Sequence, residues 1–136
     1  MWSQRSVIDY GLARRATLAD LFAGRVSTTD VCDAHTYLLR AAKFHGETTE
    51  VSCPVCRRES LTHVTYTYGD CFGEELNGRV RATRELASLA HEHPEFTVYV
   101  VEVCQGCGWN HLTSSFVLGT GCKPAQRRAR RASRAD

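Results

Sequence analysis

The sequence lacks any long hydrophobic run. Its longest apolar stretch, residues 96–103, is interrupted by Thr97 and Glu102 and is far shorter than the ~20 residues that span a bilayer. The residues up to Tyr10 contain no apolar core of a signal peptide. We therefore expect no membrane association and a cytoplasmic location.

Catalytic signatures are also missing. No G-x-S-x-G elbow, phosphate-binding loop, H-E-x-x-H pair or dinucleotide fingerprint occurs in the 136 residues. A chain of this length holds one ordinary domain, or a small domain with an appendage, and not a two-domain enzyme. We expect a protein that is not an enzyme and has no small-molecule substrate.

Cysteine, in contrast, is plentiful, with seven residues. An odd count in a reducing compartment argues against a disulfide framework and favours metal ligation with some spare thiols. Four of the cysteines form two C-x-x-C pairs, Cys53 with Cys56 and Cys104 with Cys107. Each pair can turn tightly so that two thiolates converge on one ion at ~2.3 Å, and four sulfurs satisfy tetrahedral zinc.

Zinc competes here with two alternatives, iron and a redox-active dithiol. A thioredoxin-like C-x-x-C opens a helix after a buried strand and needs no second pair, whereas iron shares the same four ligands. An all-cysteine site leaves no open position for water, which favours a role in folding over hydrolysis. We predict one Zn²⁺ per chain, whose loss unfolds its surroundings.

Three cysteines have no partner at ligand spacing. Cys32 is expected in an amphipathic helix as a small buried residue, because free cysteine is usually buried. Cys71 and Cys122 fall in predicted turns, where they are open to oxidation.

The first 46 residues have a helical pattern, with apolar positions that run from Val7 to Phe22. Ser27 and Asp30 form a capping-box-like start for a second helix that stops at Gly46. Two readings of residues 27–45 stay open: one helix, or a short helix, a turn and a second helix with Asp33 or Thr36 as its cap.

After residue 46 the period changes to two. Strands are predicted at 61–68, 96–103 and 109–118, and a helix at 79–92 that Pro94 closes. The strand at 96–103 is apolar on both faces, as expected of a central strand. The predicted fold is α+β, with N-terminal helices packed on a small antiparallel sheet of three strands and a helix inserted between the two cysteine pairs.

These residues lead to two resemblances. Cys53-Pro54-Val55-Cys56 and Cys104-Gln105-Gly106-Cys107-Gly108-Trp109 resemble the two knuckles of a zinc ribbon, a structural four-cysteine module. Gly108 suits the positive φ that such a turn needs, whereas Arg57 stands where the first knuckle often has glycine. The resemblance implies a hairpin, residues 57–103, that is enlarged by a helix.

The chain is also similar to a family of short actinobacterial proteins of unknown function. The similarity covers about residues 5–120 and brings no activity with it. It is carried by four segments: Tyr37-Leu38-Leu39-Arg40-Ala41-Ala42-Lys43-Phe44-His45-Gly46, Cys53-Pro54-Val55-Cys56, Val101-Glu102-Val103-Cys104 and Trp109-Asn110-His111-Leu112.

Positive charge is concentrated in the last fourteen residues of the sequence. Residues 123–136 carry six basic side chains against one carboxylate, Asp136, although the net charge of the whole chain is only +2. We expect three parts: a helical segment at 1–46, a zinc-ribbon α+β domain at 47–121 and a disordered basic tail at 122–136. The tail arginines that would contact phosphate are Arg127, Arg128, Arg130, Arg131 and Arg134.

Two functions are compatible with these features. The leading hypothesis is a non-catalytic zinc-ribbon accessory protein that docks on RNA polymerase, a ribosome or nucleic acid. The alternative is a protein–protein adaptor or thiol sensor without nucleic-acid binding. Aromatic residues suggest a stacking platform, but most are expected in the core; they are Tyr66, Tyr68, Tyr99, Trp109 and Phe116.

Overall fold

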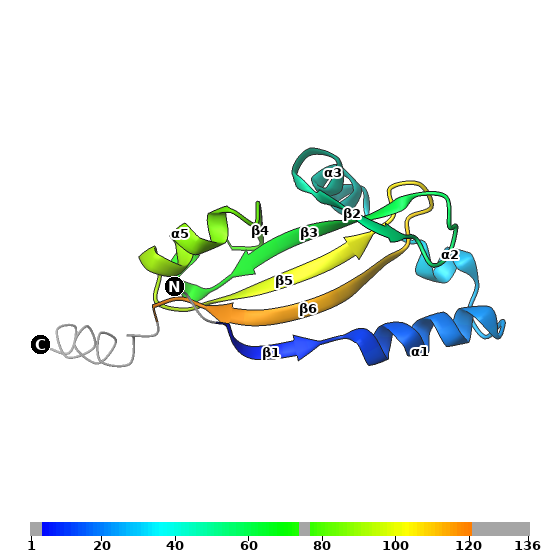
Figure 1. Ribbon diagram of the computed structural model, residues 1–136, viewed down its shortest axis with the longest axis horizontal. Helices are drawn as coiled ribbons and strands as arrows, with labels where there is room; N and C mark the ends of the chain where they lie inside the picture. Colours follow the sequence, from blue (N-terminus) through cyan, green and yellow to red (C-terminus); the bar gives the residue numbers. More distant parts are fainter. Residues whose placement is uncertain (1–3, 74–76, 121–136) are drawn as a thin grey trace, which may run out of the picture.

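The computed structural model describes residues 4–73 and 77–120 (Figure 1). They form an α+β fold around a six-stranded antiparallel sheet of order β1-β6-β5-β3-β2, with β4 paired to β3. The strands are β1 (Arg5–Asp9), β2 (Glu47–Ser52), β3 (Ser60–Tyr68), β4 (Arg79–Arg81), β5 (Phe96–Val103) and β6 (Asn110–Leu118). The helices are α1 (Gly11–Phe22), α2 (Thr28–Val31), α3 (Thr36–His45), the 3-10 helix η1 (Asp70–Phe72) and α5 (Glu85–Glu92). The predicted basic tail lies outside the described residues.

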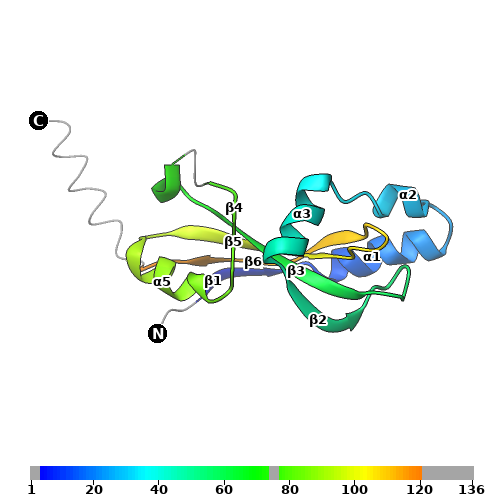
Figure 2. The same ribbon diagram turned by 90° about the horizontal axis from the view of Figure 1, so that it is seen from above.

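Strand β5 occupies the centre of the sheet, as its two apolar faces predict. It pairs with β3 on one side and with β6 on the other, and all three strands lie where the sequence places them. Phe96 and Val98 are buried with Leu86 of α5 on one face. Val103, of opposite parity along the strand, is buried with Ala42 of α3 on the other face. The helices therefore cover both sides of the sheet (Figure 2).

The N-terminal segment is not wholly helical. Residues 5–9, expected within a helix, form β1 and pair with β6. Val7 and Ile8 are 57% and 50% exposed, so their apolar character reflects an edge strand and not a helix face. Pairing with β6 favours the extended conformation. The prediction of a helix failed here because the local sequence pattern carries no information about this distant strand.

The sheet has six strands and not the predicted three. Residues 79–81, expected to open a helix, form β4 beside β3, and the helix begins only at Glu85. The polar residues 47–52 form β2, whose side chains are almost all exposed. Edge strands of this kind are stabilised by backbone hydrogen bonds to one neighbour, so they show little apolar alternation.

Residues 27–45 follow the second reading, a short helix, a turn and another helix. The capping box is present: the backbone N–H of Ser27 donates to the Asp30 carboxylate at 2.9 Å. Helix α3 is capped by His35 and not by Asp33 or Thr36, because the His35 Nδ1 accepts the N–H of Tyr37 at 3.0 Å. Cys32 consequently sits at the end of α2 and not inside an amphipathic helix.

Candidate metal centre

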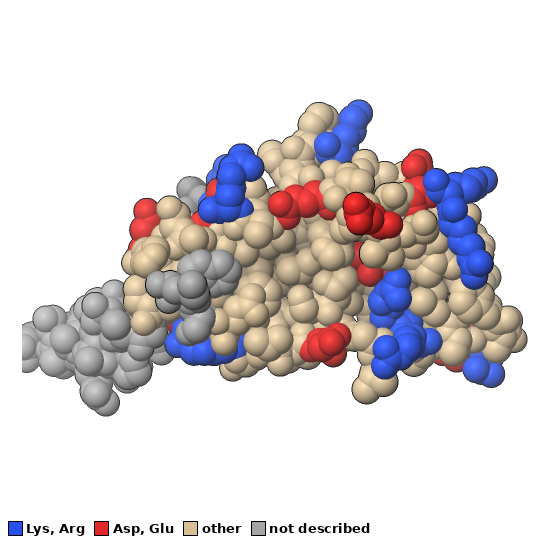
Figure 3. Space-filling model, viewed as in Figure 1, with Lys and Arg blue, Asp and Glu red and all other residues tan. Residues whose placement is uncertain are grey.

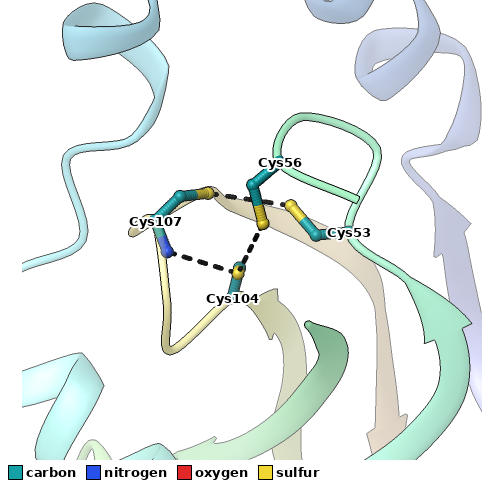
Figure 4. Close-up of side chains that lie close together, drawn as sticks. All are labelled: Cys53, Cys56, Cys104 and Cys107. Atoms are coloured by element: carbon teal, nitrogen blue, oxygen red, sulfur yellow. Dashed lines mark hydrogen bonds between the residues drawn. The ribbon is translucent and has the colours of Figure 1, made fainter. Parts of the chain in front are cut away.

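The two cysteine pairs lie in the turns of two neighbouring hairpins. The first cysteine turn (residues 53–59) joins β2 to β3, and the second (residues 104–109) joins β5 to β6. Because β3 pairs with β5, the two turns come together at one end of the sheet. Figure 4 shows the four sulfur atoms gathered between them.

Backbone hydrogen bonds shape the first cysteine turn. The N–H of Cys53 donates to the Glu59 carbonyl at 2.8 Å, and the N–H of Arg57 donates to the Cys53 carbonyl at 3.0 Å. The N–H of Val55 points at the Cys53 sulfur at 3.4 Å. The loop closes with a left-handed residue, Arg57, at a φ of 57°.

The second cysteine turn repeats this pattern. The N–H of Cys104 donates to the Trp109 carbonyl at 2.8 Å, and the N–H of Gly108 donates to the Cys104 carbonyl at 2.9 Å. The N–H of Cys107 points at the Cys104 sulfur at 3.4 Å. Gly108 has a φ of 92°, so the left-handed residue falls at the same place in both turns, four positions after the first cysteine.

The sulfur positions fit a tetrahedral ion. The sulfur atoms of Cys53 and Cys107 are 3.7 Å apart, those of Cys56 and Cys104 are 3.6 Å apart, and all four lie within 4.8 Å of one another. A zinc–sulfur bond of about 2.3 Å gives sulfur–sulfur separations of about 3.8 Å in a regular tetrahedron. All four cysteines are free, because a disulfide bond would be about 2.05 Å long. The cluster can therefore hold a metal ion.

Proton affinity differs among the four thiols. Cys53 and Cys104 are fully buried, and burial raises the pKa of both thiols. Burial also raises the pKa of Cys107, to about 12. A hydrogen bond from the backbone N–H of Arg58 is the main cause that lowers the pKa of Cys56, to about 6. Cys56 is thus the thiol best prepared to act as a thiolate ligand.

A fifth thiol borders the cluster. The Cys32 S–H donates to the Cys107 sulfur at 3.6 Å, yet Cys32 is not one of the four residues whose sulfurs all lie within 4.8 Å. Sequence spacing could not reveal this neighbour, because Cys32 belongs to no C-x-x-C pair. The side chain of Cys71 and the whole of Cys122 lie outside the described residues.

The segment between α2 and α3 holds Cys32 in place. The N–H of Ala34 donates to the Gly108 carbonyl at 3.0 Å, and the Asn110 side-chain amide donates to the Asp33 carboxylate at 3.0 Å. A Cβ added at Gly108 would lie 2.9 Å from the Cys32 carbonyl oxygen. The N-terminal helices are thus fastened directly to the second cysteine turn.

A buried polar network lies behind the cluster. Glu102 of β5 is 4% exposed and its Oε2 accepts from the Arg14 Nε at 2.8 Å and from the Trp109 Nε1 at 2.7 Å. Trp109 is fully buried and packs in the same core as Cys104. In the sequence Glu102 only interrupts an apolar run. Its role could not be predicted there, because its partner Arg14 lies far away in the chain.

The five candidate arginines of the tail lie outside the described residues. Of the expected aromatic platform, Trp109 and Phe116 are buried and Tyr68 is 44% exposed. In the described part of the chain no helix has the length and apolar character needed to cross a membrane.

Comparisons with known proteins place the chain in a family. The chain is 50% identical over 119 residues to an uncharacterized protein of Mycobacterium tuberculosis and to one of Mycobacterium bovis, which covers 88% of this chain and 85% of each relative. No solved structure matches the chain significantly. Residues 1–133 match a family described as "Family of unknown function (DUF5318)". The chain therefore belongs to the DUF5318 family.

Proposed function

We propose that the four-cysteine cluster is a structural zinc site and that the chain is a non-catalytic zinc-ribbon protein. The observation that carries this proposal is the tetrahedral spacing of four sulfurs on two matching turns, including the 3.6 Å and 3.7 Å pairs. Four thiolates fill the coordination sphere of zinc, so no position remains for water or substrate. The ion then fixes the tips of two hairpins, and its binding contributes to folding.

Metal analysis of full-length protein, purified without chelator, tests the site. We expect one zinc ion per chain and four thiols protected from alkylation, at Cys53, Cys56, Cys104 and Cys107. Purified protein without metal, with disulfides inside the two pairs, would overturn the proposal. A coloured protein that contains iron would keep the ligands but replace the ion.

The proposed partner is the transcription or translation machinery, with nucleic acid as part of the contact. The body supports protein docking, because on the face that Figure 3 shows Lys and Arg lie in separate groups with Asp and Glu between them, and this face is not uniformly basic. The tail supports a phosphate contact, since it contains five arginines within residues 127–134.

Affinity purification with and without nuclease tests the partner. We expect RNA polymerase or ribosomes to copurify, and part of the association to weaken with salt and when the five tail arginines are changed to glutamine. Partner binding that is indifferent to nuclease, salt and these substitutions would favour an adaptor without nucleic-acid binding.

The position of Cys32 favours a second candidate, a thiol sensor. Hydrogen peroxide would oxidise the Cys32 thiol and the Cys107 thiolate, whose sulfur atoms are 3.6 Å apart, to one disulfide; with one proton from solvent the peroxide would be reduced to two water molecules. This step would remove Cys107 from the ligand set. Peroxide-dependent zinc release from the native chain, lost in Cys32→Ala, is the expected result; equal release from both proteins would contradict it.

A further inference from the structure

A groove of about 970 Å³ lies between α3 and the β3–β4 pair, away from the cysteines. Exposed aromatic rings are concentrated in its lining. Tyr37 is 78% exposed, Phe44 is 65% exposed and Tyr68 is 44% exposed, and all three line the groove. Apolar rings at such exposure do not contribute to a core, so packing alone does not explain their position.

At least one of these rings is held in a fixed orientation. The Tyr68 ring meets the Tyr99 ring edge-on, with centroids 5.5 Å apart. On another side it lies against the backbone of Gly78, where an added Cβ would approach the ring to 3.0 Å. Gly78 also has a φ of 76°, which suits glycine. A ring held in this way loses little freedom when a planar ligand stacks on it.

The groove is also basic. Among the described residues, its charged lining consists of three arginines, Arg40, Arg79 and Arg81, against one carboxylate, Glu85, which pairs with Arg81 at 3.8 Å. Arg81 is held further by a 3.3 Å hydrogen bond from its Nε to Thr67. Arg40 and Arg79 are exposed. Guanidinium groups favour phosphate, because their planar N–H donors match its oxygens.

We propose that this groove binds single-stranded nucleic acid. Bases stack on Tyr37, Phe44 and Tyr68, while Arg40 and Arg79 contact the phosphates that connect them. The groove offers both rings and cations in one lining, as binding of the bases and the phosphates of a single strand requires. The proposal rests on the nucleic-acid part of the proposed function and gives that contact a place on the folded body.

Fluorescence anisotropy with labelled twelve-nucleotide RNA and DNA strands tests the groove in the full-length chain. Phe44→Ala is expected to weaken binding about tenfold, since stacking of one base is worth about 1.4 kcal/mol or more. Phe22→Ala is the matched control, because Phe22 is 64% exposed but lies on α1, outside the groove. Tyr37→Ala provides a second groove variant, and thermal melting confirms that each variant is folded.

Arginine variants separate phosphate contact from stacking. Arg79→Gln is expected to weaken binding and to reduce its salt dependence, whereas Arg15→Gln, at an exposed arginine of α1, leaves both unchanged. A duplex of the same sequence is expected to bind more weakly than the single strand, because its bases are already stacked.

Three outcomes are distinguishable. Loss of affinity in the folded groove variants, but not in their controls, supports the groove. Normal binding by the groove variants, with loss only when the tail arginines are changed to glutamine, overturns the groove and leaves the proposed function intact. No binding of either strand by the native chain overturns the groove and the nucleic-acid part of the proposed function together.

Discussion

Left-handed backbone at Arg57 and Gly108 closes the two cysteine turns, but the two positions tolerate substitution differently. Gly108→Ala is expected to lower the free energy of unfolding by about 2 kcal/mol, because it combines positive-φ strain with a contact 2.9 Å from the Cys32 carbonyl. Arg57→Gly is expected to change it by less than about 0.5 kcal/mol, since relief of strain offsets the greater entropy of glycine in the unfolded chain. Denaturant unfolding of the metal-loaded protein measures both.

Gly24 supplies a control for the contact between an added Cβ at Gly108 and the Cys32 carbonyl. It has a φ of 79°, and a Cβ there would meet nothing within 4 Å. Gly24→Ala should therefore cost only the conformational strain, about 1 kcal/mol. Equal effects at Gly24 and Gly108 would show that the α2–α3 segment does not press on the second cysteine turn.

Cys107 and Cys32 should differ sharply in metal binding, although their sulfur atoms are 3.6 Å apart. Cys107→Ala removes one of the four clustered ligands and is expected to abolish stoichiometric binding. Cys32→Ala removes only an S–H donor and should keep one ion per chain. Elemental analysis after gel filtration measures the ratio; metal loss in Cys32→Ala would make Cys32 a ligand.

Acid should release the metal, because protons compete with the ion for the thiolates. The pKa of Cys56, about 6, lies below the ordinary cysteine value of about 8.5. Its stabilising contribution is therefore complete above about pH 8.5 and is lost as the pH falls through about 6. A chromophoric chelator should detect metal release as the pH falls. In the metal-free protein, thiolate absorbance should change near pH 6, and no change near that pH would contradict the low pKa of Cys56.

At the scale of elements, the Arg14–Glu102 pair joins α1 to the central strand. The side chains are 25% and 6% exposed, so Arg14→Ala leaves a buried carboxylate with one donor among the described residues, the Trp109 Nε1. We expect a loss of about 3 kcal/mol of stability in denaturant unfolding.

An exposed ion pair is the matched control for this prediction. Arg25 and Asp20 form a bond of the same length, 2.8 Å, but their side chains are 66% and 47% exposed. Arg25→Ala is expected to cost less than about 1 kcal/mol, because solvent screens the pair. Similar losses of stability from Arg14→Ala and Arg25→Ala would mean that burial of Glu102 does not increase the contribution of its ion pair to stability.

Elements with a clear hydrophobic or cysteine pattern in their own residues were predictable from the sequence. Elements that form only by pairing with a distant strand or loop were not. The strand at 96–103 is apolar on both faces, and the C-x-x-C spacing identified the four clustered cysteines directly. β2 and β1, in contrast, are edge strands with mostly exposed side chains. Cys32 reaches the cluster only because the α2–α3 segment binds Gly108, a long-range contact that local sequence does not encode.

At the scale of the whole molecule, the sheet has a separate core at each end. Phe96 and Leu86 belong to the core at the α5 end, whereas Cys104 and Trp109 belong to the core at the metal end. Metal removal by a chelator should therefore speed amide hydrogen exchange at the metal end first, in both cysteine turns and at Ala34. Equal acceleration in α5 would show that the two cores unfold as one unit.

The pairing of β1 with β6 also limits how early the sheet can form during synthesis. Arg5 lies opposite Val117, so the first of the described strands along the chain is hydrogen bonded to the last of them. Until β6 is translated, Val7 and Ile8 have no partner strand in the sheet, and the second pair of cysteines, which directly precedes β6, is made only shortly before it. The sheet therefore cannot be completed before β6 has been made, and β1 stays without its partner during the whole of that interval.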